Sequence, residues 1–247
     1  MGYFRNHQFD KNNRTKTVVI YGCGSSLNDL TDLDRYTLSQ FDSIAFNWFA
    51  FSHIPVTYYL VREQANIPKR VHGEETVDNF YYLMNKYYKK SCLVIHDLYK
   101  HSPHAYHYWE YENWQKFDAD HITVKDVKLK DNDPCVDRWR KENILIDRYG
   151  LYHGKSTMTN AVHFAVWMGY ERIVFAGVDL YDSKYFWLKD NETRYSVKNK
   201  KKTKDSQHQT AKDTLSLVKK VKEAYPDIEM LTYNKKSLLS SVIDVWS

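Results

Sequence analysis

Short apolar runs rich in β-branched and aromatic residues recur along this chain, and turn residues bound most of them. Runs of this length are typical of strands buried in a parallel sheet. The pattern predicts strands at residues 17–22, 41–49, 55–61, 91–98, 172–180 and 228–234. Apolar positions at helical spacing lie between these runs and predict helices just after residue 24, over 157–170 and over 211–226.

Strands that alternate with helices predict one α/β domain, residues 1–247, with a mostly parallel, Rossmann-like sheet. A polar lead-in occupies residues 1–16. Residues 99–147 lack a clear period and are expected to form loops and short elements. Residues 183–208 make a long polar segment, which inside a compact domain is typical of a flexible lid over a site.

Composition and charge narrow the class of protein. The 247 residues are 43% hydrophobic and carry a net charge of +5, too small a surplus to indicate a nucleic-acid binder. Cys23, Cys92 and Cys135 match no metal-ligand spacing and favour a reducing compartment. Neither a signal peptide nor a membrane-spanning stretch is recognisable, so we expect a cytoplasmic protein. The basic surplus leaves open a peripheral contact with the inner face of the membrane.

The first predicted strand leads directly into a glycine turn, as in dinucleotide folds whose turn binds a phosphate. The turn consists of Gly22, Cys23, Gly24 and Ser25. The third glycine position of the dinucleotide motif holds Leu27, and the second strand runs into Asn47, where an NAD-binding protein has an acid. The residues favour a nucleotide other than NAD, with a merely tight turn as the alternative.

Polar side chains at the ends of other predicted elements are further site candidates. Asn47 can donate and accept hydrogen bonds to a ligand, or can satisfy its own turn. Asp179, Tyr181 and Tyr185 lie around the end of the strand at 172–180, and two phenols can donate to one phosphate. His208 ends the irregular segment, and an ordinary histidine pKa of about 6.5 suits a general base, although surface histidines are common.

Metal-binding motifs are unconvincing in this sequence. Asp-x-Asp strings at residues 32–34, 118–120 and 131–133 do not end apolar strands, so we expect solvated surface acids there. The basic run at 198–204 is expected to be a solvated loop, with contact to an anionic acceptor or lipid as the alternative.

The motifs occur in an order that resembles the bacterial CMP-sialic-acid-dependent sialyltransferases of glycosyltransferase family forty-two. The opening VVIYGCGSSL, the strand FDSIAFNWFAF, and a helix ending in MGY before RIVFAGVDLY are similar to motifs of that family. A variable segment, a histidine with a threonine shortly after it, and a closing SLLSSVI follow. The resemblance extends over residues 17–245 except 62–150, and it implies a GT-A-type variant of the Rossmann-like fold.

The resemblance implies a role for each candidate residue. Tyr181 and Tyr185 correspond to tyrosines that hydrogen-bond the departing phosphate, and His208 corresponds to the general base. Thr157 falls close to the sugar carboxylate. The residues implied to bind the donor or its nucleotide are Gly22, Cys23, Gly24, Ser25, Asn47, Thr157 and Asp179.

Three positions depart from the family pattern. Cys23 stands where the family has an asparagine that touches the nucleotide, and Leu60 stands where a second asparagine would touch the donor. Met158 replaces a glycine beside the carboxylate site. These departures bear on which acidic sugar is transferred rather than on the use of CMP.

The implied activity is an inverting transfer of sialic acid, or of a related acidic sugar such as Kdo, from a CMP-sugar to a hydroxyl of a lipooligosaccharide or capsule glycan. A CMP-sugar has one phosphate, which neutral hydroxyls can stabilise, so no metal or other cofactor is expected. Family analogy implies a homo-oligomer. The rival functions are pterin pyrophosphoryl transfer, assistance to flagellin glycosylation, and nucleotide binding without catalysis.

Overall fold

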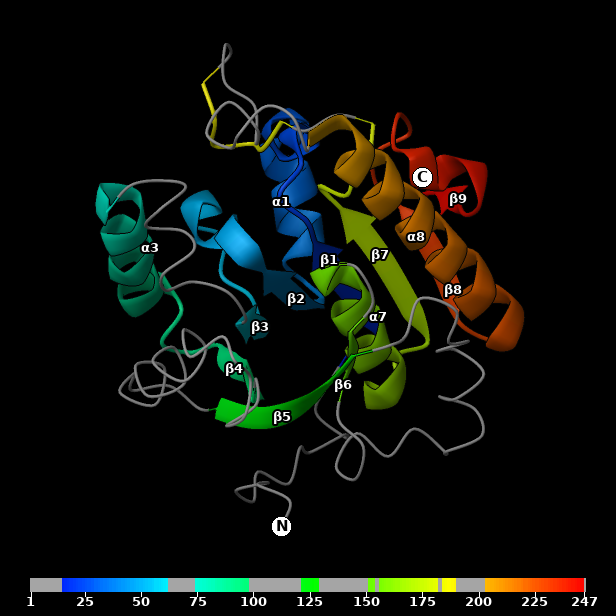
Figure 1. Ribbon diagram of the computed structural model, residues 1–247, viewed down its shortest axis with the longest axis horizontal. Coiled ribbons are helices and arrows are strands. Elements are labelled where there is room, and N and C mark those ends of the chain that lie inside the picture. The colour runs from blue at the N-terminus through cyan, green and yellow to red at the C-terminus, as the bar shows by residue number, and fades with distance from the viewer. Residues whose placement is uncertain are drawn as a thin grey trace.

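The computed structural model describes residues 15–61, 74–97, 121–128, 151–153, 156–181, 184–189 and 203–246. Within these ranges, nine strands form one sheet in the order β6-β5-β4-β3-β2-β1-β7-β8-β9, and their pairings are parallel (Figure 1). The strands are β1 (Thr17–Tyr21), β2 (Asp42–Phe46), β3 (Tyr58–Val61), β4 (Cys92–Asp97), β5 (His121–Lys128), β6 (Leu151–His153), β7 (Arg172–Ala176), β8 (Glu229–Thr232) and β9 (Asp244–Val245). The helices are α1 (Asp32–Leu38), α3 (Glu74–Tyr87), α7 (Thr157–Met168) and α8 (Thr203–Ala224), with 3₁₀ helices η2 (Ser25–Asp29), η3 (Asn47–Ser52) and η5 (Leu238–Ser241).

The strand order reverses beside β1. From β1 the chain adds β2 to β6 in one direction and β7 to β9 in the other. Tyr21, the last residue of β1, pairs with Ala45 of β2 and with Ala176 of β7, so the turns after these three strands begin at nearly the same level. In open α/β sheets, ligands bind outside the carboxyl ends of the strands where the order reverses. The topology therefore indicates a site at the carboxyl ends of β1 and β7.

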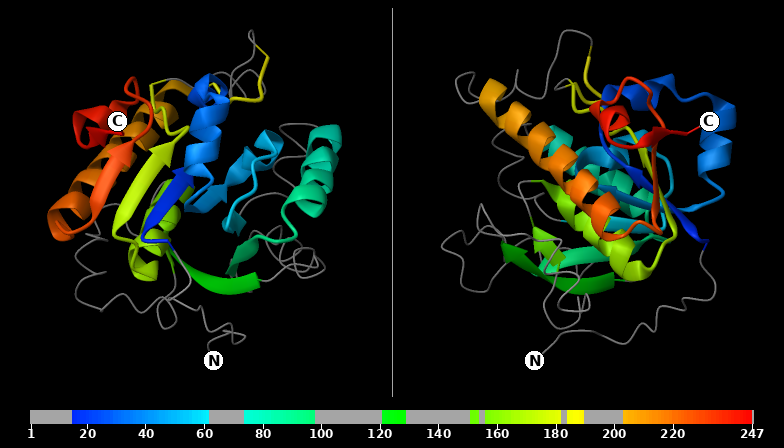
Figure 2. Two further views of the ribbon diagram at one scale, coloured as in Figure 1. Left: turned by 180° about the vertical axis from the view of Figure 1, so that it is seen from behind. Right: turned by 90° about the vertical axis from the view of Figure 1, so that its right-hand side faces the viewer.

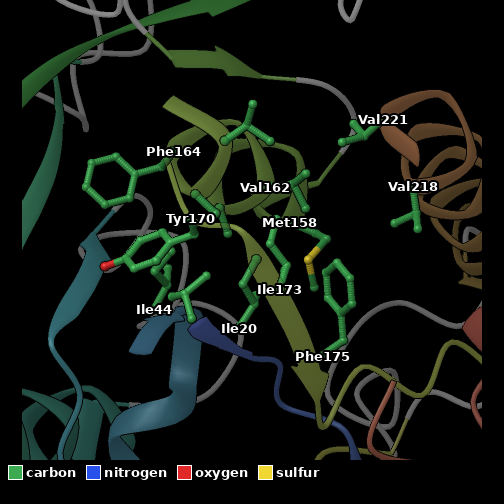
Figure 3. Close-up of a cluster of buried hydrophobic side chains, with 14 of the residues drawn as sticks. Ile20, Ile44, Met158, Val162, Phe164, Tyr170, Ile173, Phe175, Val218 and Val221 are labelled. Atoms are coloured by element: carbon green, nitrogen blue, oxygen red, sulfur yellow. The ribbon is translucent and has the colours of Figure 1, made fainter. Parts of the chain in front are cut away.

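Helices cover both faces of the sheet because successive strand residues point to opposite sides. Ile20 of β1 lies in a core formed with α7 and α8, where Met158 and Phe175 lie close together (Figure 3). Tyr21 lies in the second core, which α1, η3 and α3 complete. Figure 2 shows α8 and α1 on opposite sides of the sheet. The result is a three-layer α/β sandwich.

The predicted α/β class and parallel sheet are confirmed, and β1 to β4, β7 and β8 lie within the predicted strand ranges. The strand expected at 41–49 ends at Phe46 and continues as η3. Residues 99–147, expected to form loops and short elements, contain the eight-residue strand β5. The sequence analysis did not predict this strand because two consecutive polar residues, Lys125 and Asp126, break the alternation of polar and apolar positions. Helix α3 lies where the sequence pattern predicts no element.

The helix expected from residue 211 is longer than predicted. Helix α8 begins at Thr203, but residues 203–210 are all polar in the sequence, so an apolar pattern could not mark its start. Residues 203–208 of the predicted lid are therefore helical. Residues 190–202, which make up the middle of that lid, lie outside the described residues.

The first Asp-x-Asp string starts a helix. Thr31 accepts a hydrogen bond from the N–H of Asp34, and the Asp34 carboxylate accepts one from the N–H of Thr31, which together cap α1. Tyr233 donates to Asp34, and this bond with those from Thr31 holds the pKa of the Asp34 carboxyl below its usual range. The expected surface acid therefore stabilises a helix end. The strings at 118–120 and 131–133, and most of the basic run, lie outside the described residues.

A buried histidine on α7 predicts how stability depends on pH. Burial lowers the pKa of His163 from its ordinary 6.5 to about 3, so the folded protein keeps this imidazole neutral. Because the unfolded chain binds a proton below pH ~6.5, the free energy of unfolding should fall with decreasing pH by about 1.4 kcal/mol per pH unit in that range. Urea denaturation of the wild type and His163→Leu between pH 6 and pH 4 measures the difference in slope.

Parallel stability curves for the two proteins would show that His163 is not buried as a neutral group. A direct measurement covers the case of a poorly folded variant: in the wild type, the imidazole signals of His163 in an NMR titration should stay those of a neutral ring at pH 5.

Candidate functional site

Two glycines let the turn after β1 lie directly against the turn after β7. The N–H of Gly22 donates to the carbonyl oxygen of Ala176 at 2.8 Å, and the N–H of Gly24 donates to that of Gly177 at 2.7 Å. A Cβ at Gly24 would lie 2.3 Å from Oδ2 of Asp179 and 2.8 Å from the oxygen of Gly177. At Gly24 the turn therefore packs too closely against the residues after β7 to accept a side chain.

Asp179 connects three segments at this point. Its buried carboxylate accepts hydrogen bonds from the N–H of Ser26 at 2.9 Å, from the Ser26 hydroxyl, and from the side-chain amide of Asn234 at 2.9 Å. In dinucleotide folds, N–H groups at this place bind a phosphate. Here a carboxylate of the protein accepts from one of them. The predicted contact of Asp179 with the donor stays a prediction, whereas its bonds to Ser26 and Asn234 were not visible in the sequence.

Asn47 and Thr157, two predicted site residues, are in contact. Asn47 begins η3 with a φ of 55°, in the left-handed region that asparagine tolerates better than most residues. The buried phenol of Tyr59 donates to the carbonyl oxygen of Asn47 at 2.7 Å and accepts from the N–H of Ala50 at 3.0 Å. Oγ1 of Thr157, at the start of α7, donates to Oδ1 of Asn47 at 3.3 Å. Tyr59, which the sequence analysis missed, therefore holds the turn that presents Asn47.

Residues 184–189 lie against the glycine turn. Tyr185 forms an antiparallel bridge with Gly24, and the N–H of Phe186 donates to the carbonyl oxygen of Cys23 at 3.1 Å. The side-chain amide of Asn28 donates to the carbonyl oxygen of Phe186 at 2.8 Å. The predicted lid thus starts as a segment bonded to the turn, and this places Tyr185 beside Gly24.

Tyr181 lies at the same edge in a more open environment. It follows Leu180, whose φ of 66° is unusual for a leucine, and the Tyr181 side chain is 42% exposed. Left-handed backbone costs a residue with a side chain about 1–2 kcal/mol, and such strained residues cluster at functional sites. Leu180 and Asn47 both have this conformation just beyond strand ends, which supports a site at this edge.

The three positions that depart from the family pattern hold buried side chains. The thiol of Cys23 lies in the core beside η3 and donates to the carbonyl oxygen of Phe46 at 3.6 Å. Leu60 and Met158 lie in the opposite core with α7. These side chains fill the interior on both faces of the sheet rather than presenting polar groups at its edge.

Ser25 and His208 complete the predicted set. Ser25 begins η2 and is half-buried beside the glycine turn. His208 lies near the start of α8, and its side chain lies outside the described residues. Its role as a base therefore stays a prediction.

The described residues offer neither a ready-made metal site nor a membrane-spanning helix. Among those residues, no group of three or more His, Cys, Asp or Glu side chains is placed to hold a metal ion. The described helices include none with the length and apolar character needed to cross a bilayer.

No protein-family model and no curated protein sequence matches the chain, but two solved structures match most of its length. One is a tyrosine-to-phenylalanine variant of the sialyltransferase Cst-II in complex with CMP, at 15% identity and a TM-score of 0.52, covering 94% of this chain and 86% of the other. The second is the monofunctional alpha-2,3-sialyltransferase Cst-I from Campylobacter jejuni, at 15% identity and a TM-score of 0.51, covering 93% of this chain and 80% of the other. The chain has the fold of these sialyltransferases.

The sialyltransferase fold confirms, at the level of architecture, the resemblance drawn from the sequence motifs. Within this fold, the turns after β1, β2 and β7 bring polar and aromatic candidates to the carboxyl edge of the sheet. The candidates that direct contacts join there are Gly24 with Tyr185, and Asn47 with Thr157.

Proposed function

We propose that this chain is an inverting glycosyltransferase that transfers sialic acid, or a related acidic sugar such as Kdo, from a CMP-sugar to a hydroxyl of a cell-surface glycan. One observation carries the proposal. The backbone bridge between Tyr185 and Gly24 places residue Tyr185 beside the glycine turn, in a fold shared with a sialyltransferase in complex with CMP.

The position of Asp179 supports a donor with a single phosphate. The Asp179 carboxylate accepts a hydrogen bond from the N–H of Ser26. In a dinucleotide fold the diphosphate lies against N–H groups at this place, and here the negative carboxylate would repel it. The phosphate of a CMP-sugar would instead lie toward Tyr185 and Tyr181, whose phenols are neutral hydrogen-bond donors. Such donors stabilise a departing monophosphate, so the reaction as proposed needs no metal ion.

The proposed mechanism is an in-line displacement at the anomeric carbon. His208 removes the proton of the acceptor hydroxyl as its oxygen attacks, and CMP leaves from the opposite side with Tyr181 and Tyr185 donating to its phosphate. The configuration at the anomeric carbon is therefore inverted. Closure of the segment after Tyr185 over the donor would exclude water, which otherwise hydrolyses the activated sugar.

The proposed acceptor is a lipooligosaccharide or capsule glycan, and the proposed place of reaction is the cytoplasm, at the inner face of the membrane. The excess of lysine and arginine over acidic residues, which gives the net charge of +5, suits a peripheral contact with anionic lipid. A homo-oligomer is part of the same proposal by analogy.

A thermal-shift panel of CMP, CDP, UDP, ATP and NAD, each with and without magnesium, tests the proposed donor. A ligand that binds only the folded state stabilises it by about 2.7 kcal/mol at 100 times its Kd. CMP and CDP should raise the Tm to the same extent with and without magnesium, and UDP and NAD should have little effect.

Stabilisation by ATP only in the presence of magnesium would instead favour pyrophosphoryl transfer. Stabilisation by CMP without any release of CMP from CMP-sialic acid or CMP-Kdo would favour a binding module without catalysis.

A further inference from the structure

We propose that Trp187 is a positioning residue that fixes Tyr185 against the glycine turn by stacking between Tyr185 and Phe51. The inference rests on the proposed function for the role of Tyr185. The placement of Tyr185, however, can be measured without any turnover.

The aromatic contacts make Trp187 the link between two segments. The rings of Tyr185 and Trp187 stack with centroids 6.0 Å apart and an angle of 21° between their planes. On its other partner, Trp187 stacks with Phe51 of η3 at 5.0 Å and 27°. Trp48 of η3 lies 6.2 Å from Trp187, so two rings of η3 support it.

The supporting element is itself fixed. The two hydrogen bonds of Tyr59 hold the backbone of η3, and Trp48 packs edge-on against the buried Phe80 of α3 at 5.2 Å. A rigid η3 gives Trp187 a fixed surface on which to stack. Asn47, a candidate donor contact, is the first residue of η3. The same element also orients Tyr185, a second candidate, through Trp187.

The backbone contacts of the segment do not by themselves orient the Tyr185 side chain. The bridge to Gly24 and the bond from Phe186 to Cys23 attach the segment to the turn, and these backbone contacts open more easily when the aromatic side chains of the segment are not packed. Side-chain direction depends on what the ring packs against, and the Tyr185 ring stacks on Trp187 where it packs against the core that contains Tyr21. A hydrogen-bond donor for a leaving phosphate must be placed to within a fraction of an ångström, so this contact bears on the chemistry.

Hydrogen exchange followed by mass spectrometry tests the placement on the full chain. Trp187→Ala and Phe51→Ala should each raise exchange in peptides covering 184–189 by at least about tenfold, because local opening becomes easier. Trp187→Phe keeps a ring for stacking and should restore near wild-type exchange. Exchange in peptides covering β7 should be equal in all variants. The matched control is Trp167→Ala, which removes a partly buried tryptophan packed against Phe164 of α7 and should leave exchange of 184–189 unchanged.

Donor turnover gives the second readout. Trp187→Ala should lower kcat for CMP release by about 100-fold, with KM for the donor within about threefold, because the lost interaction develops in the transition state. Trp187→Phe should recover most of kcat.

The outcomes separate this inference from the proposed function. Wild-type exchange of 184–189 in Trp187→Ala would overturn the positioning role, whatever the enzyme does. Raised exchange in Trp187→Ala, restored in Trp187→Phe, would establish the placement even if the wild type released no CMP, and that absence of turnover would count against the proposed transferase alone.

Discussion

Replacing His208 with alanine is expected to lower acceptor-dependent release of CMP from CMP-sialic acid by about 10²–10⁴-fold, the usual contribution of a positioned general base. The reason is that an alcohol attacks poorly while it retains its proton. The affinity for CMP should change by less than about twofold, because the base acts on the acceptor and not on the nucleotide. Initial rates of CMP release and thermal shifts with CMP measure the two quantities.

The control for this variant is His53→Asn. His53 ends η3 with a φ of 58°, which asparagine tolerates, and it is exposed and stacked on Tyr87. This variant should release CMP at the wild-type rate. If His208→Ala retained full turnover, the assignment of His208 as the base would be wrong, although the fold and the donor site would be unaffected.

Gly24→Ala is expected to destabilise the protein by about 2–3 kcal/mol and to abolish stabilisation by CMP. The φ of Gly24 is −69°, which alanine adopts freely, so the cost is steric. The added methyl would meet Oδ2 of Asp179 at 2.3 Å and the backbone oxygen of Gly177 at 2.8 Å. To relieve these contacts, the turn after β1 must move away from β7 at the proposed donor site.

Gly169→Ala isolates the other cost that a glycine can carry. Gly169 ends α7 with a φ of 78°, and no atom lies within 4 Å of the position of its Cβ. Alanine there should lower the free energy of unfolding by about 1 kcal/mol, because only the left-handed backbone is unfavourable, and it should leave CMP binding intact. Urea denaturation and CMP thermal shifts of both variants measure these effects. Equal losses of stability and full CMP binding in both would show that the two turns do not pack closely.

The strands at the centre of the fold were predictable from local sequence, whereas their order was not. β1 and β7 are continuous apolar runs that each end at a glycine, which is a strong local signal. The pairing of Val18 with Ile173 brings together residues far apart in the chain, and no local pattern encodes it. The resemblance to a family supplied the architecture that periodicity alone could not.

The candidate site shows the same division. Asn47 and Thr157 were each found as polar residues at the end of an element, but their contact spans 110 positions and appears only in the structure. The contact of Asp179 with a ligand stays a prediction, whereas its bonds to Ser26 and Asn234 appear only in the structure, because sequence position beyond a strand does not fix the partners of a side chain.

Aromatic residues were the hardest to sort. The chain has 21 tyrosines and 7 tryptophans, so no local signal distinguished Tyr59 or Trp187 from the others. Their roles follow from what lies next to them: backbone groups of η3 around the Tyr59 phenol, and two stacked rings around Trp187.

The bonds of Asp179 have a consequence for how this protein is made. Asp179 bonds to Ser26, 153 positions earlier, and to Asn234, 55 positions later. During synthesis the glycine turn therefore emerges long before the carboxylate that braces it, and Asn234 emerges later still. Contacts of such long sequence separation form late in folding. If the proposed nucleotide site depends on this brace, competence to bind a nucleotide should be acquired only after Asn234 has been synthesised.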